Sequence, residues 1–565
     1  MTEKSANIEA SEALNIKASK DDVMERIIQH VGEMGTYQRW LVLAMCPFGM
    51  ALSFIYCVPM FATATPQKHW CRVPELQHLD IDLRRNLSIP GAATGSDWNR
   101  CMVYNTNWTK VLETLKPPPP ETPTVPCQYG WEFLYDDIPY ETVASERGWV
   151  CDQASYVPLS QAIFFVGSLV GCCLFGWMGD TYGRLPAFIA ANIVGFVGSI
   201  ASIVSKGVWD YTASKFLCGM ANDSCYVMLY ILVLEYVGPG HRTWVTNMTM
   251  ALFCGGGAVL TPVLALWVQD WRKLVLVTSL PMLLALGTPW TVPESVRWLA
   301  SSDKMERATT VLRKFEKVNK KQIPEDVYTE FIASSKIKSN SDESMKALLK
   351  SPPLRNSMIA IILVTMLTCI AFDGILRLSE NIGDNFFVTF ALSSMAEIPA
   401  LGVVVLTLDR FGRRTVTVVT LLLAAMFSFL CAFFARGPAQ MTLAVVMRFF
   451  VNMAMSAETQ IVPEMLPTAV RTSGNSLVHV TFYIGTIFSS YIVFLGRYWQ
   501  PLPLLLFGLM CVVSGAIALL LPETKGRAMP QTIAEGERLV RETVLCAKRT
   551  REDTYREIPL IIYNK

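Results

Sequence analysis

The chain has 565 residues, of which 52% are hydrophobic and only 17% are charged, and its formal net charge is +2. Soluble proteins carry about 25% charged residues, so this composition argues against a soluble globular class. Runs of 18 or more nearly uncharged residues recur along the sequence and are typical of membrane helices. The charge gives no indication of a nucleic-acid partner, and the polar N-terminus shows no cleavable signal peptide.

Residues 1–39 are predicted to be a cytosolic segment. Within it, Val23, Ile27, Ile28 and Val31 lie at helical spacing. This spacing predicts a short amphipathic helix at the membrane surface. The helix could be an element of a cytosolic gate or a simple membrane anchor.

A long polar loop, residues 63–155, follows the first predicted span at 40–62. It contains two glycosylation sequons, which begin at Asn86 and Asn107. It also holds four cysteines, Cys71, Cys101, Cys127 and Cys151. Four cysteines favour two disulfides, with three pairings open. These features together predict a glycosylated extracellular loop.

Eleven further spans are predicted after the loop. They lie near 157–177, 185–204, 211–234, 244–268, 273–292, 358–376, 386–408, 415–434, 441–461, 474–495 and 501–521. Twelve spans place both termini on one side of the membrane, and the Lys/Arg-rich linker at 294–357 makes that side cytosolic. The expected parts are therefore an N-terminal half at 40–293, a C-terminal half at 358–521 and a cytosolic tail at 522–565.

Three charged motifs occur twice at a constant offset of 229 residues. They are 176–184 with 409–414, 235–243 with 464–472, and 293–295 with 522–524. Three motifs repeated in the same order indicate that the two halves are copies of one unit.

These motifs carry a resemblance to known transporters. The turn Gly-x-x-x-Asp-x-x-Gly-Arg at 176–184, with its copy, resembles that of the major facilitator superfamily. The large first loop and the motifs at 31–39, 293–299, 396–399 and 521–526 resemble the organic cation, anion and carnitine transporter family. The resemblance covers about residues 25–525. It implies an all-α membrane protein with the major-facilitator fold, whose 12 transmembrane helices form two pseudo-symmetric halves of six.

One departure concerns the first charged turn. It has Thr181 and Leu185 where that family usually carries basic residues. The second turn has basic residues, Arg410 and Arg414, at the equivalent positions. The two halves could therefore be locked with unequal strength.

The charged turns are predicted to form cytosolic ion-pair latches. The candidates are Asp180, Arg184, Glu235, Arg242, Glu294, Arg297, Asp409, Arg413, Glu464, Arg471 and Glu523. Helix ends carry partial charges that such side chains can meet. By resemblance to the family's rocking mechanism, the latches would hold the two halves together in the outward-open state. A static structural turn is the alternative.

Charged side chains inside membrane spans are costly and so mark functional candidates. The candidates are four acids and one base, namely Asp223, Asp373, Glu397, Glu458 and Arg377. Tyr226 and Tyr230 follow Asp223 by one and two helical turns, so a cation could meet both a carboxylate and an aromatic ring. This pattern favours a cation, or a zwitterion whose carboxylate is held by Arg377.

Several of these positions have a second interpretation. Asp373 and Arg377 are four residues apart and could pair only with each other. Glu397 matches a glutamate of the resembling family. By register, Tyr483 falls where that family's cation carriers tend to have Asp and its anion and carnitine carriers Arg, so it supports neither charge. His479 could titrate near neutral pH or simply be packed.

The sequence thus predicts a plasma-membrane transporter, secondary or facilitative, that moves small organic cations or zwitterions such as amines, carnitine-like or amino-acid-derived solutes. The alternatives are an organic anion carrier, which the four acids argue against, and a non-transporting receptor on the same fold. No metal-ligand cluster, catalytic set or ATP-binding motif is visible, so no cofactor, metal or enzymatic activity is expected. Membrane lipid is the other expected partner, and a coupling ion stays open.

Overall fold

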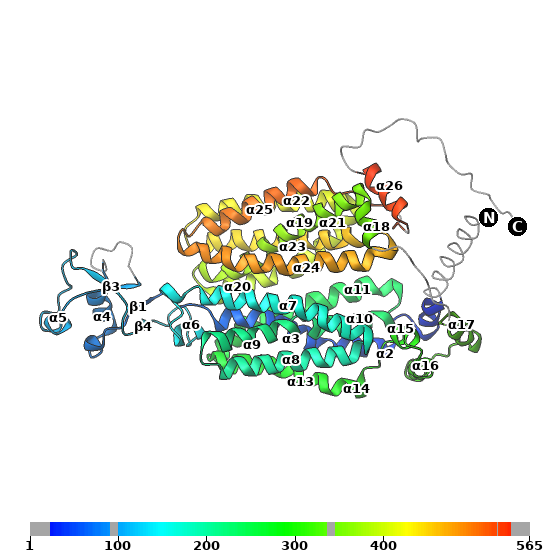
Figure 1. The fold of residues 1–565 in the computed structure, drawn as a ribbon, viewed down its shortest axis with the longest axis horizontal. Helices are drawn as coiled ribbons and strands as arrows, with labels where there is room; N and C mark the ends of the chain where they lie inside the picture. The colour runs from blue at the N-terminus through cyan, green and yellow to red at the C-terminus, as the bar shows by residue number, and fades with distance from the viewer. Residues whose placement is uncertain (1–22, 91–99, 336–344, 528, 531, 544–565) are drawn as a thin grey trace.

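The structure is a computed structural model that describes residues 23–90, 100–335, 345–527, 529–530 and 532–543. Two helical bundles, one from each half of the sequence, lie against each other (Figure 1). In the described part of the chain, eleven helices are long and apolar enough to cross a membrane, and a shorter apolar helix, α25, completes a set of twelve. The predicted all-α, twelve-helix fold is confirmed.

Each bundle contributes six spans, some of which consist of consecutive helices. The N-terminal bundle contains α2 (Thr36–Ala44) with α3 (Cys46–Ala62), α7 (Tyr156–Thr181), α8 (Arg184–Val204), α9 (Val208–Ala221) with α10 (Ser224–Tyr236), α11 (Pro239–Thr249) with the π-helical turn η4 (Met250–Gly255) and α12 (Gly256–Val268), and α13 (Trp271–Leu283) with η5 (Leu284–Gly287) and α14 (Thr288–Thr291). The C-terminal bundle contains α19 (Pro352–Arg377) with η6 (Leu378–Asn381), α20 (Phe386–Met395) with α21 (Glu397–Phe411), α22 (Arg413–Phe433), α23 (Pro438–Met465), α24 (Thr468–Phe494) with η7 (Leu495–Arg497), and α25 (Leu502–Ala518).

Two spans break beside a candidate acid. Asp223 lies at the junction between α9 and α10, and Glu397 is the first residue of α21, directly after α20. The positive end of a helix dipole therefore lies beside each carboxylate. This arrangement helps to stabilise a negative charge within a membrane span, where an isolated carboxylate is costly.

The loop between α3 and α7 projects from one end of the bundles, which we call the loop face (Figure 1). Its strands form two antiparallel pairs, β1 (His69–Cys71) with β4 (Trp131–Phe133) and β2 (Met102–Tyr104) with β3 (Thr124–Pro126). Its short helices are η1 (Pro74–Leu76), α4 (Ile81–Ser88), α5 (Trp108–Thr114), α6 (Val143–Glu146) and η3 (Cys151–Gln153). Of the three possible cysteine pairings, the structure has Cys71–Cys127 and Cys101–Cys151.

The opposite end, which we call the linker face, bears α15 (Val296–Ser301), α16 (Met305–Asn319), α17 (Glu325–Ser335) and α18 (Met345–Lys350), and α26 (Ile533–Thr543) lies beyond α25 in the sequence. Residues 23–31 form the predicted amphipathic helix, but its apolar side chains are buried in one core cluster with Phe315, Tyr328 and Phe331 of the linker helices. Arg26 also bonds to Glu330 at 2.5 Å. The prediction that this helix lies on the membrane surface is therefore wrong, because its apolar face is covered by protein.

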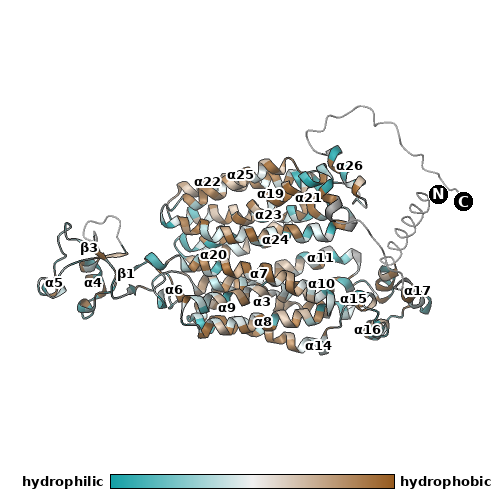
Figure 2. Ribbon diagram, viewed as in Figure 1, coloured by the Kyte–Doolittle hydropathy of each residue, from teal (hydrophilic) through white to brown (hydrophobic). Residues whose placement is uncertain are grey.

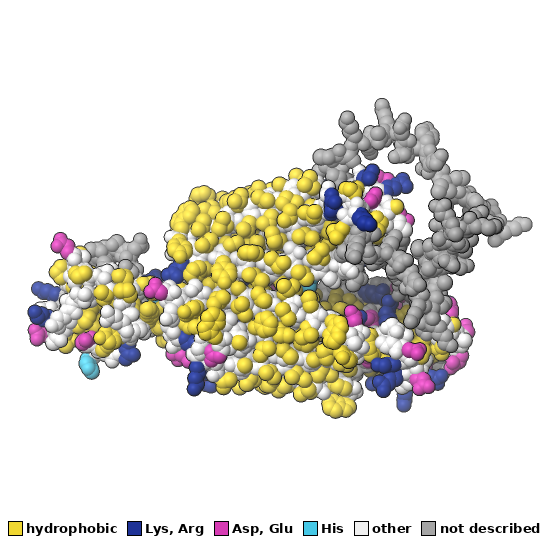
Figure 3. All heavy atoms as spheres, in the orientation of Figure 1, with side chains coloured by type: hydrophobic (Ala, Val, Ile, Leu, Met, Phe, Trp, Pro, Cys, Tyr) yellow, Lys and Arg dark blue, Asp and Glu magenta, His cyan; other side chains and the backbone are white. Residues whose placement is uncertain are grey.

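The outer faces of the bundles are hydrophobic, whereas the loop and linker regions are more polar (Figures 2 and 3). The bonds between the bundles lie toward the loop face and midway along the helices. The amide of Thr65 donates to Glu380 at 2.8 Å at the loop face, and Asp223 meets His479 at 3.1 Å in the middle. Toward the linker face, the surface between the bundles is hollowed (Figure 3).

Candidate functional site

Asp223 joins the two bundles about midway along the span that runs from Val208 to Tyr236. The hydroxyl of Tyr483 donates to its carboxylate, and Nε2 of His479 lies 3.1 Å from the same oxygen. Both partners come from α24 in the other half. The contact with His479 is an ion pair when the imidazole is protonated and a hydrogen bond when it is neutral. A change at this carboxylate therefore acts directly on the contact between the halves.

Tyr226 and Tyr230 do not lie beside the Asp223 carboxylate, although their helical spacing predicted that a cation could meet the carboxylate and an aromatic ring together. Their rings stack on each other with centroids 5.8 Å apart, and the hydroxyl of Tyr230 donates to Thr246 at 2.9 Å. Tyr226 is buried in the core of the N-terminal half. Because Asp223 precedes α10 and does not lie within it, its carboxylate meets Tyr483 and His479 in place of these two rings.

Asp373 and Arg377 form a buried ion pair with additional partners. Nε of Arg377 donates to Asp373 at 2.6 Å, and its Nη1 donates to Gln161 of α7 at 2.6 Å. The hydroxyls of Tyr56 and Ser489 donate to Asp373 as well. This hydrogen-bond network joins α3 and α7 of one half to α19 and α24 of the other. The interpretation that the two charges pair mainly with each other is the one that this geometry favours.

The other two acids lie in different surroundings. Glu397 accepts a hydrogen bond of 2.8 Å from Arg448, whose guanidinium also lies over the ring of Phe372, 3.8 Å from the centroid. Glu458 accepts from Thr368 at 2.8 Å and is buried.

Exposure divides the four acids into two classes. The side chains of Asp223 and Glu397 are each 24% exposed, whereas Asp373 is completely buried and Glu458 is 1% exposed. Only the first two carboxylates can be reached by a solute in this conformation.

The charged turns at the linker face repeat their geometry in both halves. Glu294 accepts from the amide of Arg184 at 3.0 Å, and Glu523 accepts from the amide of Arg413 at 2.9 Å. Ser295 likewise donates to Glu235, and Thr524 donates to Glu464 at 2.5 Å. The offset of 229 residues in the sequence therefore corresponds to the same contacts made twice.

Glycine is required at two positions of these turns. Gly183 and Gly412 have φ angles of +117° and +91°, which side chains rarely adopt. A Cβ at either position would lie about 2.5 Å from the carboxylate that binds the next residue, Glu294 or Glu523. The Gly-Arg pair of the motif thus lets a glutamate approach the start of the following helix.

The ion pairs of these turns lie within single halves. Arg184 bonds to Asp180 at 2.5 Å, whereas Arg413 reaches both Asp409, at 3.4 Å, and Glu464, at 3.1 Å. Arg413 therefore has one more ion-pair partner than Arg184 among these contacts, whereas unequal locking through Arg410 and Arg414 stays a prediction. The predicted latch between the halves stays a prediction about the outward-open state.

The remaining basic residues of the turns also contact their own half. Nε of Arg242 donates to the carbonyl of Val237 at 3.0 Å, and Nε of Arg471 donates to that of Leu466 at 3.2 Å. The positive charge of Arg297 acts on Glu235. These contacts hold each arginine against its own half.

Comparison with known proteins identifies the chain. A family model described as sugar (and other) transporter matches residues 98–532. The chain belongs to this transporter family. Its fold is similar to that of the xylose transporter XylE of E. coli in an inward open conformation, with a TM-score of 0.58, 15% identity, and coverage of 87% of this chain and 98% of XylE.

Curated relatives of this transporter carry narrower names. An organic cation transporter protein of Drosophila melanogaster is 29% identical over 90% of this chain and 94% of its own length. A beta-alanine transporter of the same organism is 29% identical over 92% and 90% of the two chains, and solute carrier family 22 member 1 of Oryctolagus cuniculus is 29% identical over 92% and 96%.

Two basic residues deep within the spans of this transporter were not predicted as site residues. Lys215 is buried in α9, with Nζ 5.1 Å from the ring of Tyr211, and Arg448 is buried in α23. Both fall inside predicted spans and could have been found by reading every charge in those ranges. Away from the span ends, the four candidate acids are therefore accompanied by three bases, Lys215, Arg377 and Arg448, and not by one. Whether the spans favour a cation depends on which of the four acids are accessible.

Proposed function

We propose that this transporter carries small organic cations or zwitterions across the plasma membrane by alternating access. The observation that carries the proposal is the carboxylate of Asp223, which is partly exposed midway through the membrane span and is held by groups of the opposite half. The relatives named as organic cation and beta-alanine transporters support the same substrate class.

The two faces of the chain support an orientation in the membrane. The loop face carries two disulfides, which are typical of an oxidising environment, and the side chains of Asn86 and Asn107 are exposed there. The linker face carries the basic linker, so the positive-inside rule favours a cytosolic position. We therefore infer an extracellular glycosylated loop and cytosolic termini. The functional parts would be the halves at 40–293 and 358–521, joined by the linker at 294–357.

Competition at Asp223 supplies a mechanism. A solute ammonium group is a stronger partner for a carboxylate than a tyrosine hydroxyl or a neutral imidazole. When a cation binds, it would replace His479 and Tyr483, and the contact between the halves would be lost at that point. Substrate binding would thereby change the relative stability of the two conformations, which is what a transport cycle requires.

The charge pattern bears on the competing functions. The two buried guanidiniums nearest this region, those of Arg377 and Arg448, are paired with Asp373 and Glu397, and neither contacts the accessible Asp223 in the part of the chain that the structure describes. That balance favours a cationic group over an anion carrier. A non-transporting receptor on the same fold would have no need for the latch candidates that are present in both halves.

The direct test is uptake in expressing cells of a labelled panel that contains a quaternary amine, carnitine, a biogenic amine, beta-alanine and an aromatic anion. We expect saturable uptake of amines that falls when potassium depolarises the membrane. Saturable uptake of the aromatic anion alone would identify an anion carrier, and no saturable uptake of any compound would favour a receptor.

Neutralising Asp180 tests the latch hypothesis. Asp180→Asn is expected to lower transport severalfold and leave surface expression unchanged. In the present conformation Asp180 is 74% exposed and pairs only within its own half, and exposed pairs contribute about 0–1 kcal/mol to stability. A loss of transport would therefore come from another conformation of the cycle. Normal uptake by this variant would make the turn a static structural element.

A further inference from the structure

A second polar site lies at the loop face, between the two halves. It is a cavity of about 640 Å³ lined by the loop and by the ends of α7, η6 and α24. Three segments distant in sequence each place an arginine in its wall, namely Arg100 of the loop, Arg436 between α22 and α23, and Arg497 in η7. We call this cavity the vestibule.

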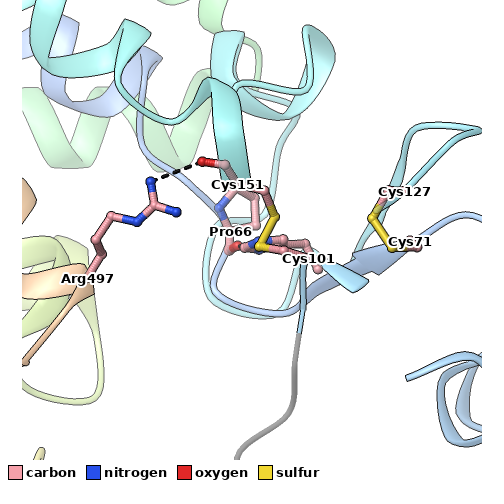
Figure 4. The surroundings of a disulfide bond; sticks show 7 residues. Pro66, Cys71, Cys101, Cys127, Cys151 and Arg497 are labelled. Carbon is pink, nitrogen blue, oxygen red and sulfur yellow. Dashed lines mark hydrogen bonds between the residues drawn. A yellow bond between two sulfur atoms is a disulfide. The ribbon is translucent and has the colours of Figure 1, made fainter. Parts of the chain in front are cut away.

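Neutral oxygens hold two of these guanidiniums. Arg497 donates to the carbonyl of Cys151 at 3.0 Å, beside the disulfide that joins Cys151 to Cys101 (Figure 4). Arg436 donates to the side-chain oxygens of Gln67 and of Asn381, the latter at 3.3 Å. These contacts fix the positions of the guanidiniums but supply no negative charge to them.

The nearby carboxylates offset this charge only in part. Glu380 accepts from the amide of Thr65 at 2.8 Å, and Asp137 accepts from that of Gln67 at 3.0 Å. Burial lowers the pKa of Arg436, the charge of Arg100 lowers it further, and Glu380 and Asp137 oppose these effects incompletely. Burial also lowers the pKa of Arg100.

His69 adds little charge to the vestibule. Its Nδ1 lies 2.9 Å from the carbonyl of Pro66, and burial lowers the pKa of its imidazole. The floor of the vestibule is formed in part by Arg377, whose charge is paired with Asp373. Apart from the paired Arg377, three guanidiniums and one carboxylate, that of Glu380, line the vestibule, and Asp137 lies nearby, so the excess charge of the vestibule is positive.

We propose that the vestibule is an anion subsite that binds the carboxylate of a zwitterionic solute before its ammonium group reaches Asp223. Guanidiniums bind carboxylates with two parallel hydrogen bonds and carry a permanent charge. A cavity of this size suits a small amino acid, since ligand pockets of about 300–1,000 Å³ are usual. The inference rests on the proposed function and narrows it, because a plain cation would gain nothing from this site.

The test compares Arg436→Gln with wild type in uptake of labelled beta-alanine and of a labelled monoamine that has no carboxylate. Glutamine can still bond to Gln67 but carries no charge. We expect the KM for beta-alanine to rise about tenfold, the effect of losing one charged hydrogen bond, with uptake of the monoamine unchanged. Lys273→Gln is the matched control, because Lys273 is an exposed cation at the first turn of α13 and does not line the vestibule.

The other outcomes overturn the proposal. An unchanged KM for beta-alanine would exclude the subsite, and an equal loss for both solutes would indicate a structural role for Arg436. The anion in the vestibule could be the carboxylate of the solute or a free anion, and replacing chloride by gluconate separates the two. If uptake depends on chloride and Arg436→Gln abolishes that dependence, a free anion occupies the vestibule. Uptake of the monoamine but not beta-alanine by wild type would refute the subsite alone, and uptake of neither would refute the proposed function with it.

Discussion

Replacing Asp223 by asparagine is expected to lower amine uptake by about tenfold to a hundredfold, since a hydrogen bond to a charged group contributes about 1.5–3 kcal/mol. The amide can still accept from Tyr483, so the contact between α24 and the N-terminal half is kept in part. What is lost is the negative charge that Asp223 offers to a cation at this junction. The loss should appear as a higher KM in a concentration series of labelled amine.

Asp384→Asn is the matched control for that measurement. Asp384 is exposed on the segment between η6 and α20, outside the contacts that join the halves. Both variants should reach the cell surface in wild-type amounts, measured by surface biotinylation. Amine uptake by Asp223→Asn within twofold of wild type would remove Asp223 from the substrate site.

Breaking the Asp373–Arg377 pair should affect stability more than affinity. Either Asp373→Asn or Arg377→Gln leaves a buried charge without its partner, which costs about 3–5 kcal/mol. We expect each single variant to unfold several degrees below wild type when detergent-solubilised protein is heated and its monodisperse fraction is measured. The double variant should recover part of the loss, because Tyr56, Gln161 and Ser489 can still form hydrogen bonds with the neutral side chains.

Lys273→Gln provides a control, because the Lys273 side chain is 72% exposed and loss of an exposed ion pair should leave the unfolding temperature nearly unchanged. The role of the buried pair Asp373–Arg377 would have to be revised if the single variants showed a different pattern. If Arg377→Gln has the unfolding temperature of wild type but raises the KM for a zwitterion, Arg377 binds the solute's carboxylate and does not serve mainly to stabilise the fold.

The helices could be predicted because each depends on a local property, a run of apolar residues long enough to cross the membrane. The charged turns were found for a similar reason, since the repeat at a fixed offset is visible in the sequence and the structure makes the same contacts in both halves. Asp223 was identified because an acid in an apolar run is costly. Its contacts with His479 and Tyr483 were not predicted, although both residues had been considered, because His479 lies 256 residues away and on the other half.

Other features depend on packing that the sequence does not display. Four cysteines in one loop allow three pairings, and only the fold selects Cys71–Cys127 and Cys101–Cys151. The apolar face of residues 23–31 fits a membrane surface and a protein groove equally well, and the linker helices decide in favour of the groove. Arg448 and Lys215 were overlooked among apolar neighbours, although both are plain in the sequence.

Potential-driven accumulation in proteoliposomes tests most directly whether this transporter binds and moves a cation. A potassium diffusion potential of about 100 mV, inside negative, is worth about 2.3 kcal/mol for one charge. It should concentrate a labelled monovalent amine about fifty-fold inside liposomes that contain the wild-type protein, and far more slowly with Asp223→Asn. Accumulation of an organic anion under the opposite potential, with no movement of the amine, would contradict this account.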